Sequence, residues 1–316
     1  MSDKIAHFEL IKRQNKKIVR NVLRDQYAIG ISDLAHETGL SYPTVSNLLK
    51  ELLETGEVLE NAETVCKGGR PAAQYSLNAK YKYGVTMILE KTGLKYIVVD
   101  TFCNEVERGT FSLVNENITK NEFILKVKQL KQKYPNIKTI ALGIPGVAIE
   151  GEIKFLDVFP DLEGNDLSKR LMDEMDIKLV VENDSNAMAL AQINGKESFA
   201  HVIYLRKCVG TGIVINGSLF RGIGGYAGEL ESICLNLQES TPAMVEVIKN
   251  ITGVLNLGKI YISADCELDI DAIIEELHTF FSVEKIPELI IVNNPELIYE
   301  KGLIERLLII WREQVG

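Results

Sequence analysis

The sequence predicts a two-part α/β protein, with a winged helix-turn-helix in residues 1–80 and a larger mixed α/β unit in residues 81–316. Three observations predict this fold class. Two helical segments flank a tight glycine turn at Gly39. A basic, glycine-rich stretch at residues 67–71 then separates two short strand-like segments. Farther along the chain, apolar strands alternate with helical segments, as in a mixed α/β sheet.

Helical spacing and capping residues predict the first two helices. Residues 4–25 carry apolar side chains near helical spacing, with basic residues between them. Ser32 is the expected N-cap of a short helix over residues 33–38, and Gly39 is expected to end that helix in left-handed backbone. The apolar residues of this helix and the next are expected to share one core: Ile31, Leu34, Ala35, Leu40, Val45, Leu48, Leu49 and Leu52.

A third helix and a hairpin complete the first part. Ser41 is expected to cap a helix over residues 42–55. Short strands follow at residues 58–60 and 74–77, and between them lies Lys67-Gly68-Gly69-Arg70-Pro71. A hairpin with a basic tip beside a helix-turn-helix is a wing.

The second helix of a helix-turn-helix turns its first residues toward base edges in the major groove of double-stranded DNA. The expected DNA-binding side chains are hydroxyls, an amide and cations on this helix and the wing: Ser41, Tyr42, Thr44, Ser46, Asn47, Lys50, Lys67 and Arg70. Arg70, between Gly69 and Pro71, suits a narrow minor groove. The alternatives are a structural or protein-binding winged helix, and a solvated hairpin tip for Arg70.

The net charge of −9 is unevenly distributed. Residues 1–80 carry 11 basic and 10 acidic residues, whereas the rest of the chain carries 24 and 34. Six cations cluster early in the first part: Lys12, Arg13, Lys16, Lys17, Arg20 and Arg24. This cluster predicts a local basic face that contacts phosphates.

Composition narrows the remaining possibilities. No apolar run reaches the ~18 residues that span a bilayer, and residues 1–17 lack an apolar signal core, so we expect a cytoplasmic protein with no membrane partner. The five cysteines form no Cys-x-x-Cys pair, and the four histidines lie far apart in the sequence. We therefore expect reduced thiols and no metal site.

In the second part, segments with the two-residue periodicity of strands alternate with segments with the periodicity of helices. Strands are expected at residues 84–89, 96–100, 107–113, 139–144, 177–181, 201–205, 212–216, 259–263 and 288–292. Helices are expected at residues 120–134, 187–193, 242–252, 270–281 and 298–313. The strands at 201–205 and 212–216 are expected to form a hairpin pair.

Three motifs in this order resemble those of the ROK family (repressors, open reading frames, kinases). They are Gly143-Ile144-Pro145-Gly146, Glu182-Asn183-Asp184-Ser185-Asn186-Ala187 and Gly224-Gly225-Tyr226-Ala227-Gly228-Glu229. The first part, ending in Gly68-Gly69-Arg70-Pro71-Ala72, is similar to the family's repressor-type DNA-binding domain. The resemblance covers nearly the whole chain. It implies an RNase H-like (actin/hexokinase-like) domain with lobes at roughly 81–190 and 191–316.

The resemblance also implies a sugar site. Asp184 stands where ROK kinases have the general base, and Asn183 and Glu229 stand where they bind sugar hydroxyls. Gly146, which ends the first motif, is also expected to lie at the ligand-binding site. The alternative for Asp184, directly before a helix, is a simple N-cap.

Departures from the family pattern predict a kinase-like domain without catalysis, with no cofactor. The first phosphate turn of ROK kinases corresponds to residues 86–91, which lack its aspartate and glycines, and Glu90 would repel a triphosphate. Arg206-Lys207-Cys208 replaces the second, Gly-Thr-Gly loop. Ser232 replaces the family's zinc-binding histidine, and Cys234 stands alone, so no zinc cluster is expected.

These features predict a transcription regulator, usually a repressor of carbohydrate genes, that binds its DNA operator as a homodimer. A sugar or sugar phosphate would act as effector. Arg206, Lys207 and Arg221 could favour an anionic one, and the favoured alternative for each of the three is a solvated surface residue. Two alternatives stay open: an active sugar kinase with an accessory DNA-binding domain, and a regulator whose second domain is a ligand-free dimerisation scaffold.

Overall fold

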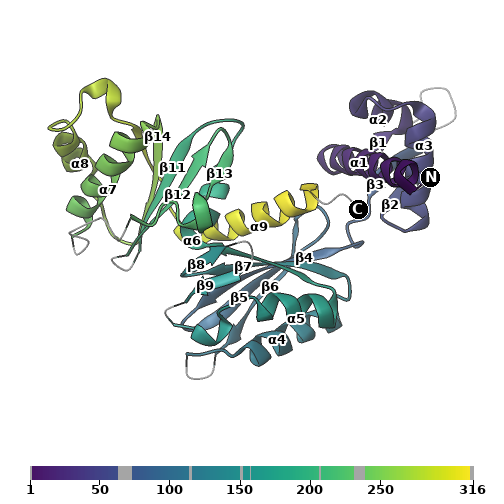
Figure 1. The fold of residues 1–316 in the computed structure, drawn as a ribbon, viewed down its shortest axis with the longest axis horizontal. Coiled ribbons are helices and arrows are strands. Elements are labelled where there is room, and N and C mark those ends of the chain that lie inside the picture. The colour runs from purple at the N-terminus through teal and green to yellow at the C-terminus, as the bar shows by residue number, and fades with distance from the viewer. Residues whose placement is uncertain are drawn as a thin grey trace.

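The computed structural model has three parts along its length, with the helix α9 running between them (Figure 1). It describes residues 2–62, 73–113, 116–149, 152–156, 158–205, 208–230 and 239–313. One part is the N-terminal helical unit, and the other two are lobes that are each built on a five-stranded sheet. The fold is therefore the predicted α/β class, with a winged helix-turn-helix before a two-lobed domain.

The N-terminal unit combines three helices with a three-stranded sheet of order β1-β3-β2. Its elements are α1 (Ser2–Gln26), β1 (Ile29–Gly30), α2 (Ile31–Thr38), α3 (Tyr42–Glu54), β2 (Val58–Ala62) and β3 (Ala73–Leu77). The strands β2 and β3 pair antiparallel, with Val58 opposite Leu77 and Ala62 opposite Ala73. The helix-turn-helix and the two strands of the wing are therefore confirmed.

The sequence correctly predicted the N-cap of α3 and the C-cap of α2, but not the N-cap of α2. Ser41 caps α3 as expected, since its hydroxyl accepts from the backbone N–H of Thr44 at 3.4 Å. Gly39 takes left-handed backbone (φ 67°) after α2. The prediction for Ser32 is wrong, because α2 begins at Ile31. Gly30 is held extended by pairing with Gln74, so the helix begins directly after this strand residue.

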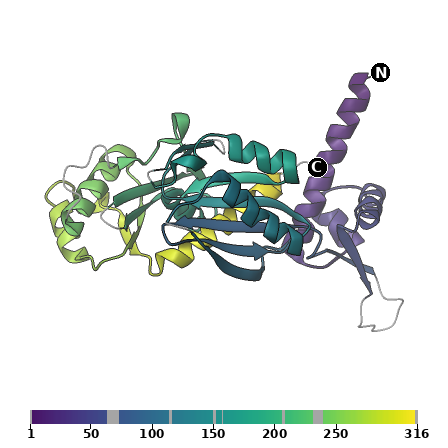
Figure 2. The same cartoon turned by 90° about the horizontal axis from the view of Figure 1, so that it is seen from below.

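One apolar core holds the N-terminal unit together. All eight apolar residues predicted for it are buried in this core or packed against it. The helix α1 contributes Val19 and Leu23 from its second half. Its first half projects beyond the rest of the unit (Figure 2), which leaves Phe8 65% exposed and Ile11 42% exposed.

The first lobe has strand order β10-β7-β4-β5-β6, in which β10, β7 and β4 are parallel neighbours. Its elements are β4 (Tyr83–Glu90), β5 (Gly93–Val99), β6 (Glu105–Ser112), α4 (Lys120–Lys133), β7 (Ile137–Ile144), α5 (Asp166–Met175) and β10 (Lys178–Asn183). The helices α4 and α5 cover one face of the sheet, and α9 (Pro295–Glu313) lies on the other (Figure 1). A small hairpin, β8 (Val147–Ile149) and β9 (Glu152–Phe155), follows β7.

The second lobe has strand order β13-β12-β11-β14-β15. Its elements are α6 (Asp184–Leu190), β11 (Phe199–Leu205), β12 (Cys208–Ile215), β13 (Ser218–Phe220), α7 (Ser240–Leu255), β14 (Lys259–Ala264), α8 (Ile270–Leu277) and β15 (Glu288–Ile291). The predicted pairing of β11 with β12 is confirmed. Within the described ranges, no helix is long and apolar enough to cross a membrane.

Several boundaries and elements differ from the prediction. The helix α6 begins three residues earlier than expected, at Asp184, and α8 ends at Leu277, four residues before the expected end. The helix α5, the β8–β9 hairpin and β13 were not predicted. The strands β8, β9 and β13 are each three or four residues long, so the sequence offers little periodicity from which to find them.

Candidate functional site

The exposed face of α3 collects the side chains predicted to contact DNA. Those that point to solvent are Ser41, Tyr42, Ser46, Asn47 and Lys50, whereas Thr44 is half-buried. The hydroxyls of Ser41 and Thr44 lie 2.8 Å apart and hydrogen-bond to each other. Thr44, Asn47 and Lys50 also line a groove of about 520 Å³ between α3 and α1. The helix therefore offers one continuous polar surface.

Four of the six cations in the predicted basic face are ion-paired or buried within the N-terminal unit, and phosphate contact by this face stays a prediction. Lys12 and Lys16 of α1 contact the carboxylate of Glu51 at 2.7 and 2.8 Å, and their hydrogen bonds lower the pKa of Glu51. Arg20 makes a bidentate contact with Glu57, at 2.7 and 2.8 Å. Arg24 is buried. Lys12, Lys16 and Arg20 hold α1 in place, because they join this helix to acidic residues of its own unit.

The wing tip carries two predicted DNA contacts that lie outside the described residues. Lys67, Arg70 and the Gly68–Ala72 motif all fall in residues 63–72, between β2 and β3. The two strands that flank the tip are described and paired. The roles of Lys67 and Arg70 therefore stay predictions.

Asn183 and Asp184 lie where β10 passes into α6, at the carboxyl ends of the parallel strands. This edge of an open α/β sheet is where ligands usually bind. Asn183 is the N-cap of α6, since its side-chain oxygen accepts from the backbone N–H of Asn186 at 2.9 Å. The alternative that Asp184 caps α6 is therefore wrong, because the N-cap is the preceding residue, Asn183. Asp184 is the first residue of α6 and its carboxylate accepts from the N–H of Ser185 at 2.7 Å.

The glycines of the motifs permit close backbone approach. A Cβ at Gly146 would stand 2.2 Å from the carbonyl oxygen of Phe155, so the glycine lets β9 return against β8. A Cβ at Gly225 would stand 3.0 Å from Ile149 of the same hairpin. The turn before Glu229 thus packs on the first lobe, and Glu229 itself is exposed at the end of this turn.

A buried carboxylate that the sequence analysis missed joins both lobes to α9. Glu182 is 1% exposed and receives two hydrogen bonds from Arg221, at 2.8 and 2.5 Å. The Nε of Arg306 on α9 lies 3.5 Å from the same carboxylate. Burial alone would lower the pKa of Arg221, but its bonds to Glu182 raise it. The expectation that Arg221 favours an anionic ligand is therefore wrong, because Glu182 already occupies its guanidinium.

Tyr299 of α9 lies close to Gly143, which pairs with Glu182. A Cβ at Gly143 would stand 2.4 Å from its hydroxyl oxygen, so the side chain lies directly on β7. Among the described residues this buried hydroxyl has no hydrogen-bond partner. Burial, followed by the negative charges of Asp184, Glu182 and Glu90, raises the pKa of Tyr299 well above its usual value. The sequence analysis missed Tyr299 because it lies outside every motif.

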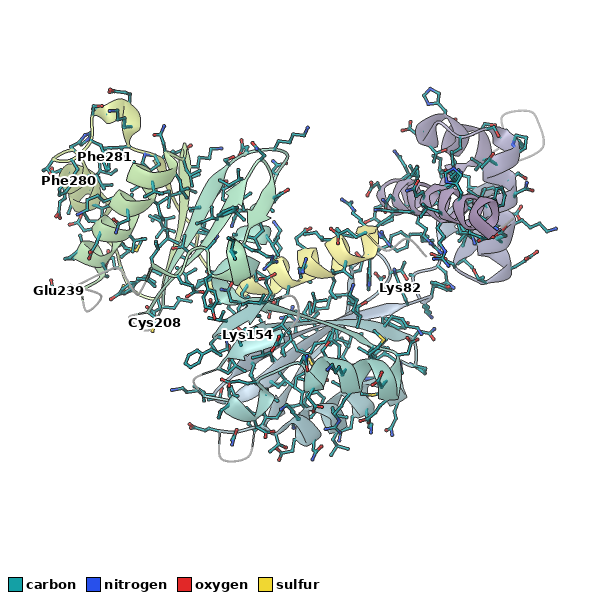
Figure 3. The ribbon with its side chains drawn as sticks, viewed as in Figure 1. Lys82, Lys154, Cys208, Glu239, Phe280 and Phe281 are labelled. Atoms are coloured by element: carbon teal, nitrogen blue, oxygen red, sulfur yellow. The ribbon has the colours of Figure 1, made fainter. Side chains whose placement is uncertain are left out.

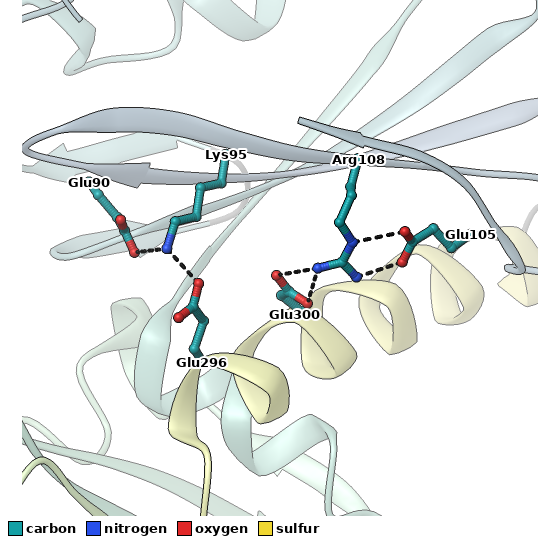
Figure 4. Close-up of polar contacts among 6 residues, drawn as sticks. All are labelled: Glu90, Lys95, Glu105, Arg108, Glu296 and Glu300. Carbon is teal, nitrogen blue, oxygen red and sulfur yellow. Dashed lines mark hydrogen bonds and ion pairs between the residues drawn. The ribbon is translucent and has the colours of Figure 1, made fainter. Parts of the chain in front are cut away.

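Charged pairs lie at the end of β4, where the sequence analysis expected the counterpart of the first phosphate loop (Figure 4). Glu90 ends β4, and its carboxylate accepts from Lys95 at 3.1 Å. Lys95 also bonds Glu296 of α9, and Arg108 lies between Glu105 and Glu300 in the same way. Arg206 and Lys207 of the second loop lie outside the described residues, and Cys208 begins β12.

The N-terminal unit meets the first lobe and the end of α9 through aromatic and charged contacts. Tyr27 stacks on Phe102 with 5.0 Å between ring centroids, and Arg312 contacts Asp25 at 2.7 Å. The ammonium of Lys82 lies 4.5 Å from the ring centroid of Trp311, where Figure 3 marks the lysine near the end of α9. The nearby Arg24 is 7% exposed, and in the described chain its Nε and Nη1 have no partner.

No group of three or more acidic, histidine or cysteine side chains in the described ranges is placed to hold a metal ion. Ser232 and Cys234, which carry the prediction about the zinc cluster, fall in the stretch 231–238 that is not described. The absence of zinc and of any cofactor stays a prediction.

Comparison with known proteins identifies relatives in sequence and in fold. The sequence model of the ROK family matches residues 92–243. A xylose repressor from Caldicellulosiruptor bescii is 29% identical over 251 residues, which cover 74% of this chain; the matched region spans 62% of the length of that repressor. The crystal structure of a ROK family transcriptional regulator, a homologue of the E. coli MLC protein, superposes with a TM-score of 0.66. It has 16% identity and covers 96% of this chain and 100% of its own.

A sugar kinase shares part of the fold. The ROK hexokinase from Thermus thermophilus superposes with a TM-score of 0.58 at 15% identity, covering 72% of this chain and 99% of its own. At this identity the likeness concerns the fold alone. The regulator structure covers a larger share of this chain than the hexokinase does.

Proposed function

Because this chain belongs to the ROK family, we propose that it is a DNA-binding transcription regulator that responds to a sugar. The observation that carries the proposal is the winged helix with a continuous, exposed polar face on α3, in a chain that matches a xylose repressor over 74% of its length. The regulator binds a double-stranded operator as a homodimer and represses carbohydrate genes. The boundary near residue 80 separates the DNA-binding domain from the effector domain.

DNA binding uses two surfaces of the winged helix. Ser46 and Asn47 project from the first half of α3 and can reach base edges, while Lys50, one turn later, contacts a phosphate. Arg70 at the wing tip enters the adjacent minor groove. The support for this arrangement is the exposure of the α3 residues and the paired strands that carry the wing.

The effector is a sugar or sugar phosphate, and D-xylose is the first to test because several relatives are named xylose repressors. Asn183, Asp184 and Glu229 bind its hydroxyls, and Gly146 lets the β8–β9 hairpin close beside them. The charged turn at Glu90 and Lys95 argues against triphosphate binding, so the domain senses a sugar without phosphorylating it. A different affinity for the sugar in two arrangements of the protein shifts the population and releases the operator.

Selection of DNA by the purified full-length chain tests the proposal. We expect double-stranded sequences with two half-sites to be enriched from a random pool, and D-xylose to weaken binding to them in fluorescence anisotropy. Arg70→Ala should weaken binding at matched salt while the dimer mass is unchanged. Enrichment of no sequence would refute DNA-specific regulation, and tight binding that no sugar or sugar phosphate changes would favour a ligand-free scaffold.

An active sugar kinase is the second candidate, favoured by Asp184 at the N-terminus of α6 beside the parallel strand ends. Measurement of ATP consumption with a panel of pentoses and hexoses separates the two functions. Turnover that disappears in Asp184→Asn would establish the kinase. We expect no turnover above the ATP-only background.

A further inference from the structure

A tyrosine hydroxyl lies without a hydrogen-bond partner beside the proposed sugar-binding residues. The hydroxyl of Tyr299 is sealed from solvent, and no donor or acceptor in the described chain bonds it. Gly143 on β7 leaves it room, since a Cβ there would stand 2.4 Å from the hydroxyl oxygen. Buried hydroxyls are nearly always hydrogen-bonded, and an unmade bond costs free energy. The exception calls for a partner that the described residues do not supply.

The strand register puts this hydroxyl near the start of α6, because Gly143, on which it lies, pairs with Glu182, two residues before Asp184. The helices α6 and α9 touch at Gly302, where a Cβ would stand 1.7 Å from the carbonyl oxygen of Ala187. Tyr299 lies three residues before Gly302, and Asp184 lies three residues before Ala187. Residues three apart share a helix face, so both side chains lie one turn from the crossing point. The negative charge of Asp184 acts on Tyr299 and helps to raise its pKa, which keeps the hydroxyl protonated as a donor.

We propose that the hydroxyl of Tyr299 donates a hydrogen bond to a hydroxyl oxygen of the bound sugar, alongside the contacts of Asn183 and Asp184. This inference rests on the proposed sugar-responsive function. A polyhydroxy ligand offers an acceptor at every carbon, so it supplies what the described residues lack. The hydroxyl is buried against β7 in this structure, so the bond forms only in a second arrangement that opens it. A contact made in one arrangement and not in the other is what lets a ligand shift the population.

The position of Tyr299 also connects the sugar to the DNA-binding unit. The same helix continues to Trp311 and Arg312, which contact Lys82 and Asp25 at the junction. From Tyr299 to Arg312 is 13 residues, or roughly 20 Å of helix at 1.5 Å per residue. A bond to Tyr299 therefore acts on the element that touches the winged helix.

Calorimetric titration of Tyr299→Phe with D-xylose tests the inference in the full-length chain. We expect the dissociation constant to rise at least tenfold, while the Tm of the unliganded protein stays the same or rises, because phenylalanine removes the unpaired hydroxyl and keeps the ring. Tyr96→Phe is the matched control, since its hydroxyl donates to Glu107 at 3.1 Å on an edge strand of the first-lobe sheet. The control should bind D-xylose like the wild type.

A set of monodeoxy-xyloses separates direct contact from a structural role. One deoxy analogue should bind the wild type more weakly than D-xylose does. Tyr299→Phe should bind this analogue and D-xylose equally well, because the variant cannot form the hydrogen bond that the analogue also lacks. Equal D-xylose affinity of variant and wild type would overturn the inference and leave the proposed function intact. If the wild type binds neither D-xylose nor any sugar or sugar phosphate tried, the sugar response fails and the inference fails with it.

Discussion

The polar residues of α3 and the carboxylate at the end of β10 differ in burial and in contacts with the rest of the protein. Ser46, Asn47 and Lys50 are exposed and project from one helix face. Glu182 is buried, and it is tied to Arg221 of the second lobe and Arg306 of α9. The α3 surface that we propose to contact DNA can be substituted without cost to the fold, whereas the residues that join the lobes support the structure as well as the proposed sugar site.

The largest expected effect is that of Glu182→Ala. The change would leave the partly buried Arg221 and Arg306 without their carboxylate, so the free energy of unfolding should fall by about 2–3 kcal/mol, after allowance for partial solvation of the two guanidinium groups. Denaturant unfolding measures it. Glu197→Ala, which breaks an exposed pair with Lys259, should change stability by less than about 1 kcal/mol. Similar losses in the two variants would remove the distinction between buried and exposed sites.

The junction offers a pH-dependent test through Lys82. Burial, with help from Arg24, lowers the pKa of Lys82 from 10.5 to about 8. Between these values the unfolded chain binds more protons than the folded one, so Lys82 should make stability rise with pH, by at most ~1.4 kcal/mol per unit. Burial raises the pKa of Cys103 from 9.0 to about 12 and acts in the opposite direction above pH 9.

Lys82→Met isolates the lysine contribution, because Cys103 is common to both proteins. Denaturant unfolding at pH 8, 9 and 10 should give a wild-type slope that is more positive than that of the variant. The groups that face Lys82, namely Arg20, Arg24, Glu57 and Cys103, are unchanged. If the free energies of unfolding of the wild type and Lys82→Met change with pH in the same way, the Lys82 ammonium is solvated in the folded protein.

Alanine substitution at Gly302, with Gly253 as a control, tests how closely α6 and α9 must approach. Gly302→Ala places a Cβ 1.7 Å from a backbone oxygen, so the helices must separate at a cost of about 1–3 kcal/mol. Gly253→Ala on α7 meets nothing within 4 Å and should raise stability by roughly 0.5–1 kcal/mol through helix propensity. Thermal unfolding of both variants measures the difference. A neutral Gly302→Ala would mean that the crossing yields easily.

The smallest expected effect belongs to α3. Lys50→Ala should leave thermal stability unchanged and make the slope of log affinity against log salt shallower by ~0.9 on the selected DNA, as expected for one lost phosphate contact. Lys259→Ala in the second lobe is the control, and its slope should equal that of the wild type. An unchanged slope in Lys50→Ala would place this lysine off the DNA.

Local signals predicted the N-terminal unit well, because its helices are set by caps and spacing within a few residues. Ser41, Gly39 and the shared apolar core all follow from neighbours in sequence. Ser32 failed because a strand pairing, Gly30 with Gln74, decided where α2 begins. The helix α5 had a usable signal that was missed, since Leu167, Leu171 and Met175 are buried at intervals of four residues.

The candidate site was predictable only where a motif named it. The family resemblance identified Asn183 and Asp184, but it did not distinguish the N-cap from the residue that follows it. Arg306 and Tyr299 lie more than 100 residues from Glu182 and Asp184 in sequence and come near them only through the return of α9. No spacing rule encodes such a contact, because it depends on how two helices cross.

The late position of α9 in the chain has a consequence for synthesis of the protein. Its residues Leu303, Leu307 and Trp311 cover one face of the first-lobe sheet, whose last strand β10 ends at Asn183. At ribosomal speeds of 5–20 residues per second, on the order of ten seconds separate the two segments. During that interval the sheet exposes apolar residues such as Ile97 and Ala141, so the nascent first lobe is a natural client for a chaperone until α9 emerges.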